Sequence, residues 1–396
     1  MVDEVKLAEG YQKTDIGLIP ADWDLDEIQN LCKVTTGSKN TQDKIENGLY
    51  PFFVRSQTVE RINCFSYNGE AVLTAGDGVG TGKVFHYING KFDFHQRVYK
   101  MSDFTDRLDG YYFFQYFKKN FYNRIIQMTA KSSVDSVRRD MIVKMTIPLP
   151  SKPEQTAIAT ALSDMDALIE GLEKLIDKKR NIKQGAMQDL LKPKEGWEEK
   201  RIGEVIKSTQ LGGNYPNNQV DNIIPLIKMG NLGRGNIVLN KIEYIERGTK
   251  PSEKDRLKYG DVLFNTRNTM ELVGKVAIWK DELSMAYFNS NLMRLIFDPS
   301  FIESNFYMNY VLNSYILIRQ LKDIATGTTS VAAIYSRDLF KIIIPLPPTK
   351  EEQTTIATAL HSFECEIANL EDHLKKYKNI KTGMMQELLT GKKRLL

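Results

Sequence analysis

The sequence is poor in cysteine, in histidine and in long apolar runs. Its three cysteines (Cys32, Cys64 and Cys365) are odd in number and far apart, which excludes a disulfide framework and favours a reducing compartment. The longest apolar runs, such as residues 342–344, are far too short to cross a bilayer. The first six residues include Asp3, Glu4 and Lys6 and lead into no apolar core, so no signal peptide is expected. These absences predict a cytoplasmic protein without a membrane partner.

Residue patterns of catalysis are also missing. The four histidines (His86, His95, His361 and His373) follow no metal-ligand spacing and accompany no cysteine cluster. Residues 75–84 (AGDGVGTGKV) approach a phosphate-binding loop, but Asp77 stands where its first glycine belongs and Val84 where its hydroxyl belongs. Clustered nuclease carboxylates and the Asn/Asp-Pro-Pro-aromatic motif of amino-methyltransferases are absent. We therefore expect no catalytic residue, no metal and no cofactor on this chain. An enzyme with an unrecognised site in the glycine-rich loop remains an alternative, and it predicts turnover or tight nucleotide binding.

Bulk composition places the chain among ordinary globular proteins. Its 396 residues are 42% hydrophobic and 26% charged, enough for two or three domains. The formal net charge is only +4, and residues 33–144 and 196–347 each carry a modest excess of Lys and Arg. Such an excess permits binding to phosphate without requiring it.

The main feature that is present is an internal repeat with a period of half the chain. Residues 155–162 (QTAIATAL) recur as residues 353–360 (QTTIATAL), displaced by 198 positions. Residues 181–191 (NIKQGAMQDLL) recur at the same displacement as residues 379–389 (NIKTGMMQELL). Each block follows the same leader, Ile-Pro-Leu-Pro, at 147–150 and 344–347. A repeat of this kind indicates duplicated structural units.

The segments between these blocks repeat only faintly. Trp23 with its acidic neighbours resembles Trp197 with its own, and residues 50–55 resemble residues 224–229. Residues 69–73 (GEAVL) align with residues 260–264 (GDVLF), which pairs Leu73 with Phe264. The chain is therefore interpreted as a variable head, a matched helix, a second variable head and a second matched helix, an arrangement that presents two different specificities on one scaffold.

Both matched blocks predict long helices with a coiled-coil seam. Apolar residues follow each other at alternating steps of four and three, a period of 3.5. The predicted seam comprises Ile158, Leu162, Met165, Ile169, Leu172 and Ile176 in the first block, and Ile356, Leu360, Phe363, Ile367, Leu370, Leu374 and Tyr377 in the second. Because each helix has a matching partner in the same chain, we expect the two to pair antiparallel. A coiled coil between separate copies of the chain is the alternative.

The fold class expected is α+β with a pseudo-two-fold internal repeat. Each head alternates short β-like runs with turn signals, and the aromatic-rich stretches 111–117 and 306–311 are interpreted as buried helices against those strands. The expected domains are a first head (1–150), a first helix (151–195), a second head (196–347) and a second helix (348–396).

Polar loops between the predicted strands supply candidate DNA contacts. Arg pairs with guanine and Asn or Gln with adenine in the major groove, while Lys, Ser and Thr often contact phosphate. The candidates in the first head are Lys39, Asn40, Arg55, Gln57, Lys83, Lys131 and Ser133. Those in the second head are Asn214, Tyr215, Lys228, Asn231, Arg267, Asn268, Lys275, Thr328 and Thr329.

The whole layout resembles the specificity subunits of type I restriction-modification systems. The doubled leader is followed each time by Glu-Gln (Glu154 with Gln155, Glu352 with Gln353) and then by the long helix. The helix ends at 188–191 and 386–389 and the entry at 17–23 (GLIPADW) also fit the family.

The resemblance implies a non-catalytic DNA-binding subunit. In that family each head is a target recognition domain that reads one half of a split site in double-stranded DNA. The paired helices separate the heads and dock two adenine-methyltransferase (modification) subunits, which carry S-adenosylmethionine. A motor-nuclease (restriction) subunit can join to cleave unmodified DNA. The rival from another class is a scaffold whose coiled coil and aromatic heads bind protein, and it predicts no salt-dependent binding to duplex DNA.

Overall fold

The computed structural model describes residues 10–129, 136–220 and 223–395. The chain divides into two compact units, one formed by residues 1–174 with 372–396 and the other by residues 175–371. Each of the two long helices, α4 (Lys152–Leu190) and α9 (Lys350–Leu388), contributes one part to each unit. None of the helices in the described ranges is both long enough and apolar enough to span a membrane.

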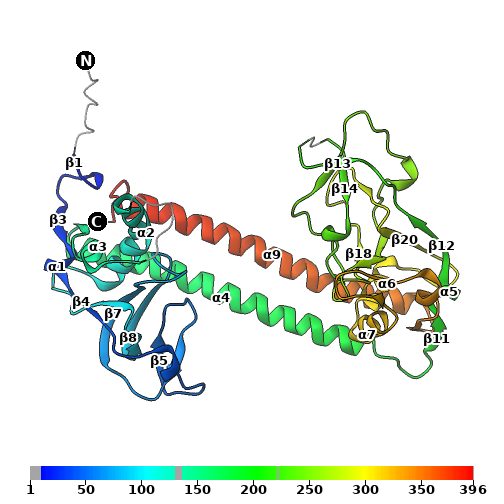
Figure 1. The fold of residues 1–396 in the computed structure, drawn as a ribbon, viewed down its shortest axis with the longest axis horizontal. Coiled ribbons are helices and arrows are strands. Elements are labelled where there is room, and N and C mark those ends of the chain that lie inside the picture. The colour runs from blue at the N-terminus through cyan, green and yellow to red at the C-terminus, as the bar shows by residue number, and fades with distance from the viewer. Residues whose placement is uncertain (1–9, 130–135, 221–222, 396) are drawn as a thin grey trace. The chain divides into compact units, whose positions relative to one another are not determined.

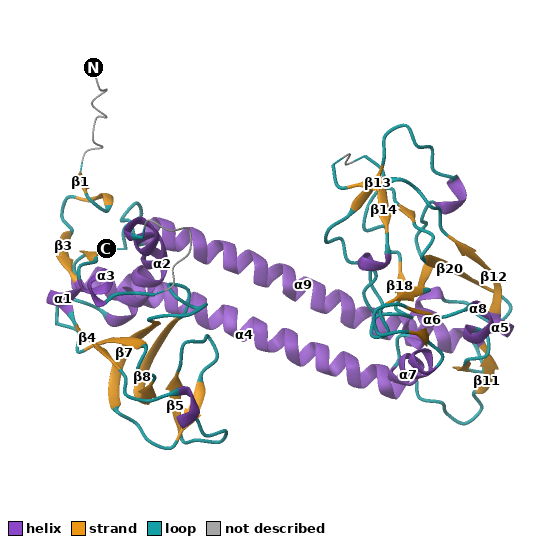
Figure 2. Ribbon diagram, viewed as in Figure 1, coloured by secondary structure: helices purple, strands orange, loops and turns teal. Residues whose placement is uncertain are grey.

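Besides its parts of α4 and α9, the described residues of unit 1 form a six-stranded mixed sheet, two two-stranded sheets and three α-helices (Figures 1 and 2). Its elements are β1 (Tyr11–Thr14), β2 (Gly17–Pro20), β3 (Asp24–Glu27), α1 (Ile28–Leu31), β4 (Lys33–Thr36), η1 (Thr41–Asp43), β5 (Tyr50–Phe53), β6 (Glu60–Ile62), β7 (Tyr67–Ala75), β8 (Phe85–Phe94), β9 (Val98–Ser102), α2 (Gly110–Met128), α3 (Arg139–Val143) and β10 (Thr146–Leu149).

The core of unit 1 lies between this sheet and α2. The strand order is β4-β9-β7-β8-β5-β6, and only the β5–β8 pair is parallel. Helix α2 is capped by Asp109, whose carboxylate accepts hydrogen bonds from the backbone N–H groups of Tyr111 and Tyr112, each at 3.0 Å. Its aromatic side chains Phe113 and Phe117 are completely buried. The aromatic stretch predicted as a buried helix is therefore confirmed as core.

Unit 2 repeats this plan with shorter strands. Its elements are β11 (Glu198–Arg201), α5 (Ile202–Val205), β12 (Ile206–Leu211), β13 (Asn217–Asn218), β14 (Pro225–Ile227), η2 (Met229–Asn231), β15 (Glu243–Ile245), η3 (Glu253–Asp255), β16 (Val262–Asn265), β17 (Arg267–Asn268), β18 (Val276–Ile278), β19 (Tyr287–Phe288), β20 (Leu292–Phe297), α6 (Asn305–Leu312), α7 (Tyr315–Asp323), β21 (Thr326–Gly327), β22 (Ala332–Ala333), α8 (Ser336–Leu339) and β23 (Ile343–Leu346).

Two sheets of unit 2 together correspond to the six-stranded sheet of unit 1. One has the order β12-β20-β16-β18 and the other the order β13-β15-β14-β19. Helix α6 is capped by Ser304, whose hydroxyl accepts from the N–H of Tyr307. Tyr307 and Met308 are completely buried. The predicted second aromatic helix is confirmed at α6.

Helices α4 and α9 pack antiparallel within each unit. In unit 1, Asp166 of α4 pairs with Lys381 of α9 at 2.5 Å. In unit 2, Lys183 pairs with Glu364 at 2.7 Å. Unit 1 also holds the pair of Glu173 with Lys378, and unit 2 the pair of Lys179 with Glu366, each at 2.6 Å. Within each unit, residue numbers therefore fall along α9 as they rise along α4, which defines the antiparallel direction. This confirms the predicted pairing within one chain.

The predicted seam is the buried face of both helices. Ile158, Leu162, Ile169 and Ile176 are buried on α4, as are Ile356 and Leu360 on α9. The other predicted seam residues, Met165 and Leu172 on α4 and Phe363, Ile367, Leu370, Leu374 and Tyr377 on α9, are half-buried. An apolar period of 3.5 therefore predicted the packing face correctly.

The repeated Glu-Gln pair ties the start of each long helix to its head. Gln155 is buried, donates to the carbonyls of Arg107 and Pro150, and accepts from the N–H of Asp109. Gln353 likewise donates to the carbonyl of Phe301 at 2.8 Å and accepts from the N–H of Glu303. These bonds satisfy backbone groups of the loops that lead into α2 and α6.

The glutamate of each pair receives an indole N–H. Trp23 donates to Glu154 at 3.2 Å, and Trp197 donates to Glu352 at 3.3 Å. In unit 1 the C-terminal tail completes this contact, because Arg394 pairs with Glu154 at 2.6 Å and with Asp22 at 2.8 Å. We call Trp23, Glu154, Asp22 and Arg394 the terminal latch.

Gly391 allows the tail to reach the latch. It has a φ of +68°, and a Cβ atom at this position would lie 2.3 Å from the Cγ of Pro20. Only glycine fits both the backbone conformation and the space.

One predicted correspondence between the heads is wrong by a single residue. Ala75 pairs with Val98 across β7 and β9, while Asn265 pairs with Leu292 across β16 and β20. Val98 and Leu292 are equivalent, because each donates its N–H to the third residue before it, at 2.9 Å. Leu73 therefore corresponds to Leu263 and not to Phe264. Neighbouring strand residues point to opposite faces, so the faint sequence similarity alone could not fix this register.

Candidate nucleic-acid interface

Five connecting segments of unit 1 meet at the turn between β8 and β9. The N–H of His95 donates to the carbonyl of Phe53 at 2.9 Å, and that of Gln96 donates to Lys39 at 2.8 Å. Gly76 joins the loop after β7 to the same turn, because its N–H donates to the carbonyl of Arg97 at 2.8 Å. Its carbonyl accepts from the N–H of Val137 at 2.7 Å. We call these bonded segments (37–40, 54–57, 76–83, 95–97 and 136–138) the loop framework of unit 1.

Unit 2 has the same hydrogen-bonded arrangement. Asn289 donates to Ile227 at 3.0 Å and Ser290 donates to Gly213 at 3.1 Å. Thr266 donates to Asn291 at 3.1 Å, and its carbonyl accepts from the N–H of Ile334 at 3.0 Å. Each of these four bonds has a counterpart in unit 1. We call the segments that they join (212–215, 228–231, 266–275, 289–291 and 334–336) the loop framework of unit 2.

A glycine in the first segment permits this close approach in both units. A Cβ atom at Gly37 would lie 2.0 Å from the carbonyl oxygen of Phe94, and one at Gly212 would lie 2.2 Å from that of Phe288. Any larger residue would push the segment away from the turn between the two strands.

Two arginines converge on one carboxylate in the unit 1 framework. Arg55 pairs with Asp77 at 2.7 Å, and Arg97 pairs with the other oxygen of Asp77. Burial raises the pKa of Asp77, but the hydrogen bonds from the two arginines outweigh it and leave the pKa below its ordinary value of 3.8. Asp77 is therefore an anion at neutral pH, and the cluster carries a net charge of about +1.

His95 and Gln96 hold the neighbouring segment in place. The N–H of Arg97 donates to Nδ1 of His95 at 3.0 Å, which requires an unprotonated Nδ1. Burial, followed by the positive charge of Arg55, lowers the pKa of His95 below its ordinary value of 6.5. The ring is therefore neutral at pH 7 and serves as an acceptor. Gln96 donates to the side-chain oxygen of Asn40 at 2.6 Å.

In unit 2 the framework lines a polar cavity of about 570 Å³. Thr266, Arg267, Ser290 and Asn291 contribute to its wall. The hydroxyl of Thr266 donates to the carbonyl of Asn291 at 2.9 Å, which fixes the wall on one side. The Arg267 side chain is exposed. A polar cavity with one arginine and one amide can accept hydrogen-bonding groups of a base edge or a phosphate.

Most of the candidate residues of the first head belong to its framework. Lys39 and Asn40 lie beside the β8–β9 turn, and Arg55 lies in the Asp77 cluster. Gln57 is exposed two residues further along the same segment, and Lys83 lies over the ring of Tyr122 at 5.5 Å. Lys131 and Ser133 lie outside the described residues. Contact of any of these residues with DNA stays a prediction.

The candidates of the second head are more scattered. Arg267 and Asn268 form β17, Asn214 is exposed, and Lys275 lies opposite Asn265 in the framework. Thr328 and Thr329 lie in the exposed turn between β21 and β22.

Three further candidates make structural contacts inside unit 2. Tyr215 donates to Asp255 and accepts from the N–H of Ser252. Lys228 pairs with Glu243 at 2.8 Å. Asn231 is buried and donates to the carbonyls of Val238 and Asn240. Their contact with DNA also stays a prediction.

Sequence reasoning did not select Asp77, Arg97 or Asn291 as candidate residues. A usable signal was present, because an aromatic residue, three polar residues and an aliphatic residue follow each other at 94–98 (FHQRV) and at 288–292 (FNSNL). This shared pattern marks the turn that orders both frameworks.

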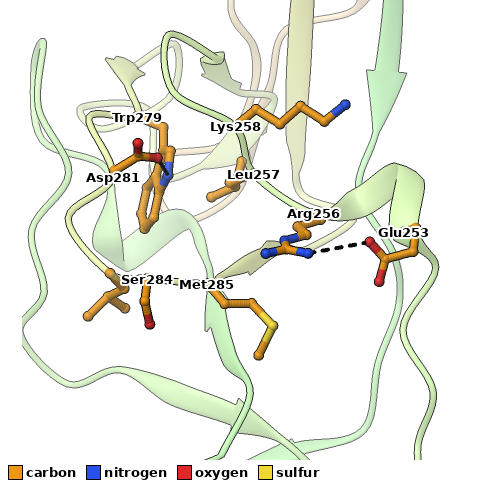
Figure 3. A pocket seen from close by; sticks show the side chains of 9 residues that line it. Glu253, Arg256, Leu257, Lys258, Trp279, Asp281, Ser284 and Met285 are labelled. Carbon is orange, nitrogen blue, oxygen red and sulfur yellow. Dashed lines mark hydrogen bonds and ion pairs between the residues drawn. The ribbon is translucent and has the colours of Figure 1, made fainter.

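A separate cavity of about 480 Å³ in unit 2 contains none of the candidate residues. Figure 3 shows its charged side chains, among which Arg256 and Glu253 pair at 3.8 Å. The indole N–H of Trp279 donates to Asp281 at 3.2 Å. In the described parts of the chain, this cavity included, no three His, Cys, Asp or Glu side chains form a group that could hold a metal ion.

Comparison with known proteins relates the whole chain to one family. The family described as "Type I restriction modification DNA specificity domain" matches residues 20–179 and 194–378. The type I restriction enzyme MjaVIII specificity subunit of Methanocaldococcus jannaschii is 26% identical over 95% of this chain and 94% of its own length. The type I restriction enzyme EcoDI specificity subunit of Escherichia coli is 30% identical over 39% of this chain and 33% of its own length.

Solved structures agree at the level of the fold. The crystal structure of a type I restriction-modification S subunit from M. genitalium superposes with a TM-score of 0.65 and 16% identity, covering 97% of this chain and 98% of that one. Because two consecutive parts of the sequence match the family and together cover most of it, the chain belongs to the DNA specificity subunits of type I restriction-modification systems.

Proposed function

We propose that this chain reads a split DNA site, one half with each head, and brings partner methyltransferase subunits to it. The observation that supports this proposal is the duplicated loop framework, in which equivalent backbone positions carry different side chains. A single scaffold with two different sets of side chains suits two dissimilar half-sites better than two copies of one short sequence.

The physical basis of recognition has two parts. Basic side chains near the frameworks release counterions from the DNA backbone and give salt-sensitive affinity. Base-edge contacts, each worth roughly 1–3 kcal/mol, give discrimination between sequences. Because both heads belong to one chain, binding of the second half-site is nearly intramolecular once the first is bound.

The recognition domains of this proposal are residues 1–150 and 196–347, joined by helical segments 151–195 and 348–396. The paired helices provide the surface on which two modification subunits dock, and these subunits supply S-adenosylmethionine and the chemistry of adenine methylation. A restriction subunit is a further partner in systems that cleave DNA. The complex works in the cytoplasm on double-stranded DNA.

The test is base-resolution mapping of methyl-adenine in cells that lack other adenine methylation. The modification subunit of the same system is expressed with this chain and, from the same vector without its gene, in the absence of this chain. We expect methylation only when both proteins are present, in a motif of two dissimilar halves around a fixed gap. Absence of methylation with both proteins soluble would contradict the proposal and favour a protein-binding scaffold.

A further inference from the structure

The two loop frameworks differ in charge at three corresponding positions. Each position is fixed by the backbone bonds that it follows or makes, so the comparison does not depend on sequence similarity. The first position lies two residues after the strand residue whose carbonyl accepts from the turn, which is Phe53 or Ile227. The second position follows the loop residue whose N–H donates to the turn, which is Gly76 or Thr266. The third position is the turn residue whose carbonyl accepts that hydrogen bond. The corresponding pairs are Arg55 and Met229, Asp77 and Arg267, and Arg97 and Asn291.

In unit 1 these positions form the arginine pair on Asp77. The side chains of Arg55 and Arg97 are 41% and 62% exposed, whereas that of Asp77 is 16% exposed. The carboxylate is therefore less exposed than the two arginine side chains, which both stay partly open to solvent. A guanidinium group has five N–H donors, and one hydrogen bond to Asp77 uses only one of them.

This arrangement is more than charge neutralisation. One arginine would balance Asp77, so the second adds an uncompensated positive charge beside the first. Exposed ion pairs contribute little to folding, and two like charges in contact oppose each other. Both side chains are nevertheless held by a shared carboxylate, which fixes the orientation of each planar fork. Fixed, solvent-facing forks are what bidentate recognition of a base edge needs.

Unit 2 presents a different combination on the same backbone. An exposed arginine, Arg267, replaces the carboxylate, and the amide of Asn291 replaces the second arginine. Both residues line the polar cavity of the unit 2 framework. The three positions therefore carry a carboxylate between two guanidinium groups in unit 1. In unit 2 they carry one guanidinium group and one side-chain amide.

We propose that Arg55 and Arg97, oriented by Asp77, are the guanine-reading side chains of the unit 1 head, and that Arg267 and Asn291 read bases of the other half-site. Guanine is assigned because its O6 and N7 acceptors match the two parallel donors of an arginine fork. Asp77 contacts no base in this scheme and acts as a positioning residue. This inference rests on the proposed function and names the residues through which each half-site is read.

The test maps methyl-adenine with variants of the chain and measures affinities on duplexes. Arg97→Ala and Arg97→Lys address the unit 1 head, and Arg267→Ala addresses the unit 2 head. Arg107→Ala is the matched control, since Arg107 pairs with Asp26 at 2.6 Å on the same head and is 53% exposed. Affinities of the chain with its modification subunits are measured for the wild-type motif and for duplexes in which each guanine of the motif is replaced.

We expect both Arg97 variants to lose the preference for guanine at one position of one half-site. The ratio of affinities for duplexes with and without that guanine, about 5 to 150 in the wild type, should fall to near one. Arg97→Lys retains the charge, so its affinity for nonspecific duplex should stay close to that of the wild type. Arg267→Ala should relax only the other half, and Arg107→Ala should leave the motif unchanged. If Arg97→Ala abolishes methylation, the same affinity ratio measured for Arg97→Lys decides whether Arg97 reads the guanine.

An unchanged guanine preference in both Arg97 variants, or equal relaxation of both halves, would overturn this inference while leaving the proposed function intact. A wild-type chain that directs no methylation and prefers no duplex would overturn the proposed function, and this inference with it.

Discussion

Asp166 of α4 and Lys381 of α9 form an ion pair at 2.5 Å that recurs 198 residues away with its charges on opposite helices, as Glu364 of α9 and Lys183 of α4. Each acidic residue also contacts its own head. Asp166 accepts from Tyr111 and Gln115, and Glu364 accepts from Lys280. Each pair therefore fixes the helix register and the attachment of a head together, a role known for buried polar groups in coiled coils.

Replacement of Lys381 by methionine should destabilise the protein. Lys381 is only 12% exposed, and its loss leaves the half-buried Asp166 carboxylate without its ion-pair partner. We expect the free energy of unfolding to fall by about 1–3 kcal/mol, measured by thermal or urea unfolding. The matched control is Lys378→Met, because Lys378 pairs with Glu173 while both side chains are about half exposed. The control should cost less than about 1 kcal/mol, and equal losses in both variants would contradict the register role.

Acid should weaken the same two pairs. Burial raises the pKa of Asp166 and of Glu364, but their lysine partners outweigh it and leave both pKa values below the ordinary 3.8 and 4.5. Carboxyl groups with lowered pKa values stabilise the folded state above their unfolded pKa and lose that contribution as pH falls through the folded pKa. Stability should therefore decline as the pH falls below about 4.5, measured as Tm against pH. The Asp166→Asn/Glu364→Gln variant should show a shallower decline, and an identical slope would exclude these pairs as contributors.

The terminal latch predicts a strong dependence on Arg394. Glu154 is only 1% exposed, and Arg394 is its cationic partner. Arg394→Met should destabilise the protein by about 3 kcal/mol, because a buried carboxylate keeps only the indole of Trp23. Hydrogen exchange should rise at residues 10–23 before it rises elsewhere, since these residues contact the tail.

Unit 2 provides the control for this prediction. Lys194 lies 3.8 Å from Glu352, whose side chain is 30% exposed. Lys194→Met should cost less than about 1 kcal/mol. A loss as large as that of Arg394→Met would show that the two helix starts are equivalent and that the tail contact has no special weight.

The sequence contained enough to predict the repeat, the helices and their pairing. These features depend on local periodicity and on identical residues at a fixed displacement, and the buried face of α4 and α9 follows from them directly. The Glu-Gln pair was found as a motif, but its role needed the structure, because Gln155 bonds to Arg107 and Asp109 more than 45 residues away.

The loop framework could not be predicted in the same way. Asp77 was considered only as a misfit in a phosphate-binding pattern, although it joins Arg55 and Arg97 from segments 22 and 20 residues away. Such contacts depend on strand register, and the register inferred for 69–73 was wrong by one residue. The candidates Asn231 and Tyr215 are polar loop residues whose side chains bond to neighbouring backbone groups, a distinction that residue type does not reveal.

The length of the paired helices should set the gap between the half-sites. Four residues inserted into both α4 and α9, beside the Glu173–Lys378 pair, add about 6 Å of helix. At about 3.4 Å for each base pair, the unread gap should grow by roughly two base pairs, as read from the methylated motif. Four substitutions at the same places without insertion serve as the control. An unchanged gap in the insertion variant would contradict this relation.

The most direct test of the account is the affinity of the chain with its modification subunits for duplexes that differ only in the gap between the two halves. If each head reads its own half, lengthening or shortening the wild-type gap by three base pairs should lower the affinity to that of a duplex with one half-site, a loss of about 10²- to 10⁴-fold. Equal affinity across all gaps would contradict the account, because it would mean that the two heads do not bind one site together.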